Sequence, residues 1–403
     1  MALMPVAEAL ARVLVQASPL APELAALIEA HGRVLADDLA ALRTQPPADV
    51  SAMDGYAVRA VDIATVPARL KVVGEVAAGH PFEGSIGVGQ AARIFTGAVL
   101  PPGADTVVIQ ENTCREAETV IIGSTAAKGR HVRVAGLDFV SGAVPLRRGR
   151  RLSDRDVALA AAMNHPRVPV HRRPRVAVLA TGDELVMPGE KPGHGEIVYS
   201  NGYATMALAC RESCEVIDLG IVPDAFEETA AAVRRARDLR ADVLVTSGGA
   251  SVGDHDLVQQ ALAREGLELS FWKVAMRPGR PMMHGRLGSM HVLGMPGNPV
   301  SAYVCSVLFL VPLIRRLCGR SDVEPMPEAA SLGCELPAND ERADYLRATL
   351  TLGAECVPVA TPAKLQDSSM LTPLADADCL LLRMPHAPAA KAGDLCSIIR
   401  LPI

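Results

Sequence analysis

The sequence predicts a multidomain protein that combines a parallel α/β domain with β-rich domains. Three observations lead to this prediction. The chain has 403 residues, more than one hydrophobic core normally organises. Short apolar segments alternate with helical ones from about residue 174 to 320, which is typical of a parallel sheet covered by helices. On either side of this region, segments rich in valine and isoleucine are separated by glycine and proline turns.

The part before the α/β region begins with an amphipathic helical pattern within residues 5–45 and continues with short strands over 50–135. The segment LSDRDVALAAAM follows, and Ser153 or Asp154 is a good N-cap for a helix there. We therefore expect the following division of the chain: a helical linker domain (1–48 and 136–173), a β-rich domain (49–135), the α/β domain (174–320) and a C-terminal β-rich domain (324–403).

Composition excludes several classes of protein. The formal net charge is −5 and aromatic residues make up 3% of the chain, which argues against a general nucleic-acid surface. The cysteines have no C-x-x-C pair, so reduced thiols are the simplest interpretation. The N-terminal segment lacks the uninterrupted apolar run of a signal peptide, and the apolar run over 300–314 is too short to span a bilayer. We expect a cytoplasmic protein that binds neither nucleic acid nor membrane.

In the α/β region, four apolar strands end in polar turns: RVAVLATGDEL, SCEVIDLGIVPD, ADVLVTSGGASVGD and MHVLGMPGNPVS. Ligands of such sheets bind at the carboxyl ends of the strands, so these turns predict one shared site. Glycines let backbone N–H groups approach a phosphate, although a purely structural strand-to-helix turn explains the pattern equally well, and no Walker sequence is present. The candidates from the first and third strands are Thr181, Ser247, Gly248, Gly249 and Ser251.

Acidic residues at the same rim suggest a cation. Glu184, Asp224 and Asp256 would repel one another and a phosphate unless Mg²⁺ lay among them. Helix N-capping is the alternative explanation, and it suits Asp224 and Asp256 better than Glu184. Cations follow in FWKVAMRPGRP, where Lys273, Arg277 and Arg280 surround a Pro-Gly turn. They suit a bound oxyanion, and a solvated basic loop is the alternative.

One rival motif points to a different reaction. Residues 249–253 fit G-x-S-x-G, the nucleophile elbow of α/β hydrolases, and His284 and His291 lie downstream. Of the acids between that serine and the histidines, Glu265 and Glu268 lie on a predicted helix, and no HGGG-type segment is present. The sequence therefore disfavours a hydrolase.

The complete set of motifs resembles the molybdenum insertase family, the MoeA proteins of bacteria and the matching domain of gephyrin. The motifs are SAMDGYAVR, FTGAVLPPGAD, TGDEL, TSGGASVGDHD, RPGRP and GMPGNPVSAY, and the resemblance covers nearly the whole chain. The related molybdopterin adenylyltransferases share the SGG-x-S-x-G turn but lack the first two segments.

The resemblance implies an elongated homodimer that binds adenylyl-molybdopterin, molybdate and Mg²⁺, releases AMP and leaves molybdenum on the dithiolene. It also implies a molybdopterin adenylyltransferase and molybdoenzyme chaperones as partners. By matching position, Pro296, Asn298, Pro299 and Ser301 would shape the pocket. Asp54, Thr96 and Asp138 would approach it from the second subunit. The acids would hold Mg²⁺, the glycine turn would hold the phosphate of the pterin or nucleotide, and the three cations would hold molybdate or phosphate.

Departures from the family pattern leave other functions open. Leu137, Ala225 and Asp367 stand where the family commonly has an acid, an Asp and a glycine, and Arg277 and Arg280 replace lysines. A non-catalytic cofactor carrier or scaffold, or a molybdopterin adenylyltransferase, are therefore the alternatives. The intact acids favour the insertase, and the extra N-terminal domain and long linker of gephyrin are not found in this sequence.

Overall fold

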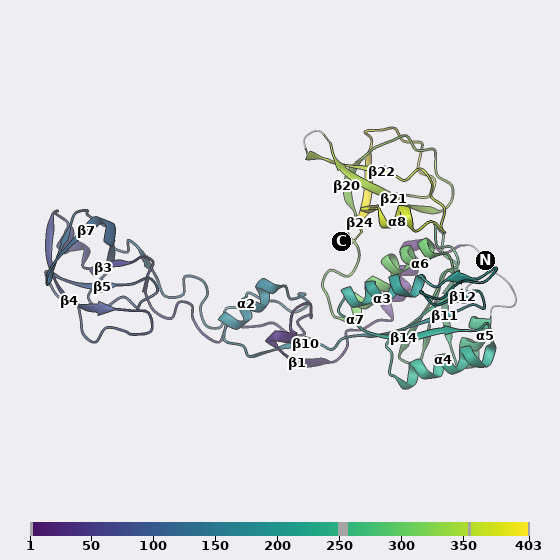
Figure 1. The fold of residues 1–403 in the computed structure, drawn as a ribbon, viewed down its shortest axis with the longest axis horizontal. Helices are drawn as coiled ribbons and strands as arrows, with labels where there is room; N and C mark the ends of the chain where they lie inside the picture. Colours follow the sequence, from purple (N-terminus) through teal and green to yellow (C-terminus); the bar gives the residue numbers. More distant parts are fainter. Residues whose placement is uncertain (1–2, 249–256, 354–355, 402–403) are drawn as a thin grey trace.

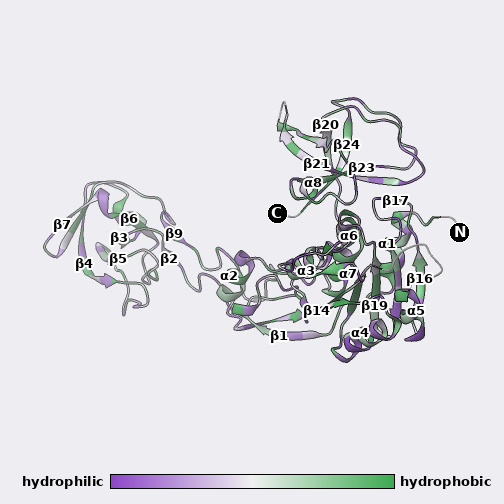
Figure 2. Cartoon of the chain, turned by 45° about the vertical axis from the view of Figure 1, so that its right-hand side comes forward, coloured by the Kyte–Doolittle hydropathy of each residue, from purple (hydrophilic) through white to green (hydrophobic). Residues whose placement is uncertain are grey.

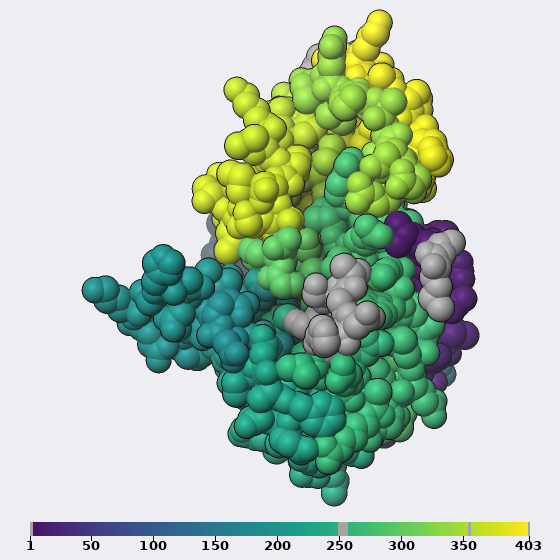
Figure 3. Space-filling model, turned by 90° about the vertical axis from the view of Figure 1, so that its right-hand side faces the viewer, coloured from purple at the N-terminus to yellow at the C-terminus, as the bar shows by residue number. Residues whose placement is uncertain are grey.

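The computed structural model describes residues 3–248, 257–353 and 356–401. The molecule is elongated: a β-rich part lies at one end, a small part around α2 lies in the middle, and the α/β part lies at the other end (Figure 1). The C-terminal sheet rests on the α/β part, as the space-filling view also shows (Figure 3). The division into domains expected from the sequence stays a prediction.

The N-terminal segment forms one short helix and then a strand. Helix α1 (Val6–Val15) packs its buried side chains into the core of the α/β part, against α7 (Val311–Leu317). Strand β1 (Pro22–Ala26) pairs antiparallel with β10 (Arg167–His171) and leads into a 3-10 turn, η1 (Leu27–Glu29). The helical pattern thus ends earlier than its apolar spacing suggests, because prolines cannot donate the N–H that a continuing helix needs.

Helix α2 (Asp154–Ala162) begins where the sequence predicts. The Ser153 hydroxyl accepts the N–H of Asp156 at 3.3 Å, and the Asp156 carboxylate accepts the N–H of Ser153 at 2.9 Å. This reciprocal capping box satisfies two of the N–H groups that a helix start leaves without partners. Ser153 is therefore the N-cap, and Asp154 is the first helical residue.

The β-rich part is a mixed sheet with the strand order β6-β3-β5-β4-β8-β7. Its buried residues are mostly alanine, valine and isoleucine, which alternate with exposed side chains along the strands. The elements are β3 (Gly55–Val58), η2 (Ala60–Ile63), β4 (Ala68–Val76), β5 (Gln90–Ile94), β6 (Thr106–Ile109), η3 (Gln110–Asn112), β7 (Thr113–Glu116) and β8 (Thr119–Ile122), with the small pair β2 (Val50–Ser51) and β9 (Val132–Arg133) at its base.

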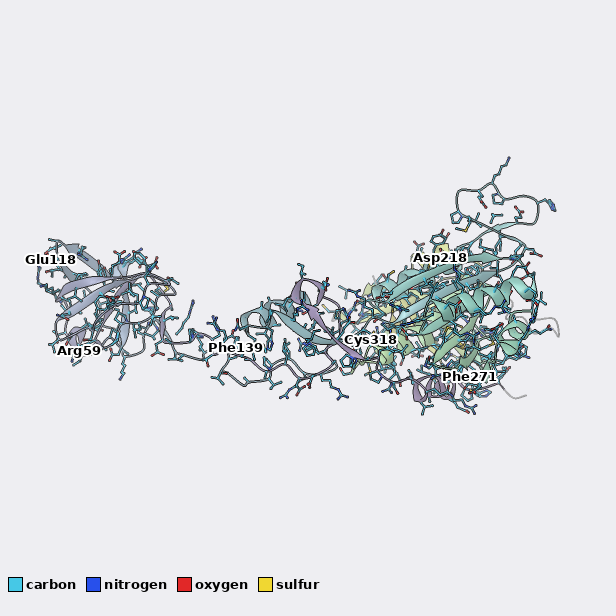
Figure 4. All side chains as sticks on the ribbon, turned by 90° about the horizontal axis from the view of Figure 1, so that it is seen from below. Arg59, Glu118, Phe139, Asp218, Phe271 and Cys318 are labelled. Carbon is cyan, nitrogen blue, oxygen red and sulfur yellow. The ribbon has the colours of Figure 1, made fainter. Side chains whose placement is uncertain are left out.

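A narrow connection joins the β-rich part to the rest of the molecule, and Phe139 lies on it (Figure 4). The two chain segments that cross it bond to each other: Gln45 N–H donates to Phe139 O at 2.9 Å, and Gly136 N–H donates to Pro46 O at 2.9 Å. Phe139 is buried. These contacts pair the two crossing segments along the connection.

The α/β part is built on a sheet with the strand order β14-β11-β15-β19-β18-β16. The predicted strands β11 (Arg175–Thr181), β14 (Glu215–Val222), β15 (Val243–Ser247) and β19 (Met290–Met295) are parallel to one another. Two strands not expected from the sequence, β16 (Glu268–Trp272) and β18 (Met283–Leu287), extend the sheet antiparallel at one edge. A short arm, β12 (Leu185–Val186) paired with β13 (Ile197–Val198), leaves the sheet after β11.

Helices cover both faces of this sheet. Residues 299–317 are continuous apolar helix, and hydrophobic side chains gather there and in the strands (Figure 2). This segment is the one described helix that is long and apolar enough to cross a membrane, but 83% of its most apolar window is buried inside the protein. The helices are α3 (Asn201–Arg211), α4 (Phe226–Asp238), α5 (Leu257–Arg264), α6 (Pro299–Cys305), the π-helical segment η4 (Ser306–Leu310) and α7.

The C-terminal part is a sheet with the strand order β17-β21-β22-β20-β24-β23. Its first strand, β17 (Met276–Arg277), comes from the α/β part and pairs parallel with β21, so the two parts share backbone hydrogen bonds. The remaining elements are β20 (Glu328–Leu332), β21 (Ala343–Leu352), β22 (Pro358–Pro362), α8 (Thr372–Ala375), β23 (Cys379–Arg383) and β24 (Leu395–Arg400). The largest buried cluster continues from the α/β part into the C-terminal part through Ala343, Tyr345 and Leu380. We propose that the four parts are nevertheless four domains, with α1 packed on the third.

Candidate functional site

A cavity of about 330 Å³ opens at the carboxyl ends of β11 and β15, beside the start of α6. This is the edge at which the sequence predicts a shared site. The structure brings together there the candidates Thr181, Glu184, Ser247, Gly248, Asn298 and Pro299. The other described lining residues come from the arm, the start of α3, the turn before α6 and the C-terminal part: Leu185, Ile197, Val198, Tyr199, Ser200, Asn201, Gly297, Ser369 and Leu371.

The turn after β15 is held close to the turn after β11. Gly248 has a φ of +94°, and a Cβ at this position would lie 2.2 Å from the carbonyl oxygen of Thr181. No other residue fits here without moving backbone, so the glycine is required by both conformation and space. The Thr181 hydroxyl is buried and has no hydrogen-bond partner among the described residues, which leaves it available to a ligand. Gly249, Ser251 and Asp256 lie outside the described residues.

The carboxylates of Asp183, Glu184 and Asp224 lie close to one another at the same strand ends. The N–H of Asp224 donates to Asp183 Oδ1 at 3.0 Å. Desolvation raises the pKa of Asp224, and the negative charges of Asp183 and Glu184 raise it further. Like charges held this close favour a cation among them, so the donor set fits Mg²⁺. Within the described residues, no three acidic, histidine or cysteine side chains are already arranged as metal ligands.

The predicted cations lie outside the lining of the cavity. Arg277 forms a two-pronged ion pair with Asp344 of β21, in which Nε donates to Oδ1 at 2.9 Å and Nη2 bonds to Oδ2. This pair raises the pKa of Arg277. The Lys273 ammonium lies 5.0 Å from the centre of the Trp272 ring. Neither Lys273 nor Arg280 has an ion-pair partner among the residues that the structure describes.

Comparison with known proteins identifies the family. Residues 4–164 match the MoeA N-terminal region (domains I and II), 177–316 a probable molybdopterin-binding domain, and 329–401 the MoeA C-terminal region (domain IV). The chain is 36% identical over 389 residues to a molybdopterin molybdenumtransferase of Nostoc sp., covering 94% of this chain and 89% of the relative. The chain belongs to the MoeA family.

Further relatives support this membership. A molybdopterin molybdenumtransferase of Haemophilus influenzae is 33% identical, with 94% of each chain covered. The structure of a molybdopterin biosynthesis MoeA protein from Pyrococcus horikoshii superposes with a TM-score of 0.85 at 28% identity, covering 99% of this chain and 100% of that one. The multidomain fold of this MoeA family member is therefore that of a solved relative.

The candidates of the β-rich part lie far from the cavity within one chain (Figure 1). Asp54 Oδ1 accepts the N–H of Thr96 at 2.7 Å and its hydroxyl at 2.8 Å, and these bonds lower the pKa of Asp54. Asp138 is exposed on the connection, where its N–H donates to Gln45 O at 3.0 Å. One chain of this MoeA family member thus places Asp54 beside Thr96 but neither beside the cavity.

Sequence reasoning did not single out several residues at the site. Asp183 was visible in the TGDEL turn, beside the chosen Glu184. Asn201 stands at the start of α3, where its amide donates to Gly297 O at 2.6 Å. Ser369 and Leu371 come from a part about 70 residues later in the chain, and local pattern gives no signal for their position. Pro296 and Ser301 are buried beside the turn without lining the cavity.

Proposed function

We propose that this chain is a molybdopterin molybdenumtransferase, which inserts molybdenum from molybdate into adenylyl-molybdopterin and releases AMP. The observation that carries the proposal is the cavity at the strand ends, with a glycine turn on one side and carboxylates on the other. A phosphoanhydride needs N–H donors for its oxygens and a cation for its charge, and both fit this edge. Membership of the MoeA family supplies the substrate class.

The glycine turn would receive the phosphate end of the substrate. The backbone at Ser247 and Gly248 approaches the cavity without a side chain in the way, because Gly248 has none. Gly249 and Ser251, which follow in sequence, are proposed to complete this turn. The free Thr181 hydroxyl would add a hydrogen bond.

Magnesium is the proposed resident cation. Glu184, Asp224 and Asp256 would hold it, and Asp183 lies within the same group of charges. When bound there, Mg²⁺ would offset the negative charge of the pyrophosphate and polarise the bond that breaks. By holding the cation at one side of the cavity, the carboxylates would also fix the orientation of the phosphate. Their mutual repulsion would fall on binding, so they favour the loaded state.

Molybdate, the second substrate, is proposed to bind at Lys273, Arg277 and Arg280. Lys273 and Arg280 retain N–H donors without ion-pair partners among the described residues. Arg277 is largely engaged: Asp344 takes one edge of the guanidinium, and Nη1 also donates to Asp340 Oδ2 at 3.5 Å, although the side chain is half exposed. It would therefore hold the turn in place, while Lys273 and Arg280 would supply most of the N–H donors to the oxyanion.

The working form is proposed to be a homodimer in the cytoplasm. The Asp54–Thr96 pair and Asp138 lie too far along one elongated chain to reach its own cavity, whereas a second copy laid antiparallel would bring them to it. The adenylyltransferase that makes the substrate and the chaperones of the receiving enzymes are the expected partners. Mixed dimers test this arrangement directly, as described below.

The experiment that tests the function is AMP release from adenylyl-molybdopterin by the purified chain, with molybdate and Mg²⁺ added singly and together. Release that needs both supports the transferase. Tight binding without release would instead indicate a carrier, and ATP-dependent adenylylation of molybdopterin would indicate an adenylyltransferase. Both of these results would contradict the proposal.

A further inference from the structure

One wall of the cavity comes from the C-terminal part, through the segment 367–371. This segment is pinned to the start of α6 by two bonds: Val300 N–H donates to Ser368 O at 3.0 Å, and the Asn298 amide donates to Ser368 Oγ at 2.9 Å. Ser369 and Leu371, on either side of Met370, line the cavity. Their placement is therefore fixed by contacts that cross from one part of the molecule to the other.

Ser369 has its only hydroxyl proton already in use. Asp367 Oδ1 accepts that hydroxyl at 2.6 Å and the Ser369 backbone N–H at 2.8 Å. The hydroxyl bond, and then the backbone bond, lower the pKa of Asp367, so it remains an acceptor at neutral pH. A serine hydroxyl has one proton and two lone pairs, so Ser369 can offer the cavity only an acceptor.

The other polar groups at this end of the cavity include further acceptors for a ligand that donates. Glu184 offers a carboxylate. Asn201 has one amide N–H bonded to Gly297 O, and Asn298 has one bonded to Ser368, so each keeps its carbonyl oxygen as an acceptor beside one further N–H. No lysine or arginine is among the described lining residues, and the apolar ones suit a planar ring: Leu185, Ile197, Val198 and Leu371.

We infer that Asp367 and Ser369 form a specificity element that recognises an exocyclic amino group of a nitrogen heterocycle. The ligand would lie with its heterocycle toward Ser369 and its phosphate toward Gly248, across the cavity. This inference rests on the proposed function, since it takes the cavity to be the substrate site. Asp367 acts through Ser369 and is a positioning residue. In a chain with glycine at 367, the serine hydroxyl would be free to donate as well as accept.

The test compares ligands that differ in one donor group, using isothermal titration calorimetry on the full-length protein. The first pair is pterin and lumazine, which has an oxo group in place of the 2-amino group. The second pair is AMP and purine riboside monophosphate, which lacks the 6-amino group. The variants are Ser369→Ala, Asp367→Ala and Asp367→Asn. The matched control is Asp394→Ala, which removes a carboxylate that accepts the Lys391 N–H at 2.7 Å in another turn of the C-terminal part.

We expect the wild type to prefer the amino-bearing member of one pair by about 3- to 10-fold, the effect of one hydrogen bond. That preference should disappear in Ser369→Ala. It should shrink in Asp367→Ala, because the Ser369 hydroxyl is then free to donate to an acceptor on the ligand as well. It should persist in Asp367→Asn, because the amide oxygen still accepts from Ser369, and in the control. The pair that shows the preference identifies the heterocycle as pterin or adenine.

Other results would overturn the inference. Equal affinity within both pairs, or a preference that survives Ser369→Ala, means that Ser369 does not read the donor. If none of the four compounds binds while AMP release proceeds, the heterocycle lies elsewhere and the proposed function stands. If AMP release is absent as well, the inference and the proposed function fail together.

Discussion

Asp54 Oδ1 accepts two hydrogen bonds from Thr96, one from the backbone N–H at 2.7 Å and one from the hydroxyl at 2.8 Å. The two residues are 42 positions apart: Asp54 directly precedes β3 and Thr96 follows β5, and these two strands pair antiparallel. Their contact fixes the direction of an exposed carboxylate at the end of the molecule that lies farthest from the cavity. This fixed, exposed carboxylate is the feature on which the proposed second copy rests.

Mixed dimers provide the first prediction. We expect Asp54→Ala and Glu184→Ala chains to be inactive when pure, since each lacks one half of every site. When they are mixed and allowed to exchange, half of the dimers carry one intact site, so activity should return to about one quarter of the wild-type value. AMP release before and after exchange measures this. No recovery, with exchange verified by mass, would contradict a site shared between subunits.

Gly248→Ala should reduce AMP release as well as stability, because the added side chain clashes with neighbouring backbone in addition to straining a positive φ. The new Cβ would meet the Thr181 carbonyl oxygen at 2.2 Å, so the turn must move. Gly266 is the matched control: its φ of +95° is almost the same, and a Cβ there meets open space. Both variants should lose about 1 kcal/mol of folding free energy from the positive φ. Only Gly248→Ala should also lose AMP release; equal activity in both would refute a role for this turn.

Asp344→Asn should loosen the C-terminal part. The Asp344 carboxylate is 5% exposed and pairs with Arg277, whose guanidinium is half exposed. Because solvent screens one partner, we expect the free energy of unfolding to fall by about 1–2 kcal/mol, less than for a fully buried pair. Urea titration followed by circular dichroism measures the change. Asp340→Asn should cost less, because the Asp340 side chain is itself 35% exposed, and the reverse order would contradict this account.

Because His284 and His291 are buried, we expect the free energy of unfolding to fall as the pH is lowered. His284 Nε2 lies 3.3 Å from His291 Nδ1, and burial lowers the pKa of His284 to about 4 and that of His291 to about 3. Both are neutral in the folded state, while the unfolded chain takes up protons below about pH 6.5. Their contribution is therefore complete above that pH and is lost as pH falls toward 4, by roughly 1–3 kcal/mol between pH 7.5 and 5.5.

Urea unfolding at these two pH values measures that loss. Replacing both histidines with leucine should flatten the difference between pH 7.5 and 5.5, whatever it does to stability at neutral pH. A double variant that keeps the full difference would show that other groups cause it. His31, which is exposed, provides the control substitution.

The sequence predicts those parts of the fold in which local rules and tertiary packing agree. The strands before TGDEL, TSGG and MPGNP are apolar runs that end in turns, and the structure has β11, β15 and β19 there. The N-cap at Ser153 follows from side-chain chemistry alone. The apolar spacing predicts helix within residues 5–45, and this prediction is wrong after the prolines, since the segment from Pro22 is a strand paired with a partner far along the chain.

The site was predictable only where a single strand end carries it. Glu184 and Gly248 lie within three residues of β11 and β15, so the parallel topology brings them together. Ser369 reaches the cavity because β17 and Ser368 tie the C-terminal part to the α/β part, and no local pattern encodes such contacts. The sequence does not predict the ion pair of Arg277 with Asp344 for the same reason, although it does mark Arg277 as a candidate to bind an oxyanion.

The most direct test of the central claim is AMP release by Glu184→Gln, measured beside Glu190→Gln. Both glutamates follow β11, and Glu190 is exposed and accepts the Met187 N–H at 2.9 Å. We predict that Glu184→Gln loses release by at least about 100-fold, as expected when a group that holds a catalytic cation is neutralised, while Glu190→Gln keeps wild-type activity. Unchanged release in Glu184→Gln would contradict the assignment of this cavity as the active site.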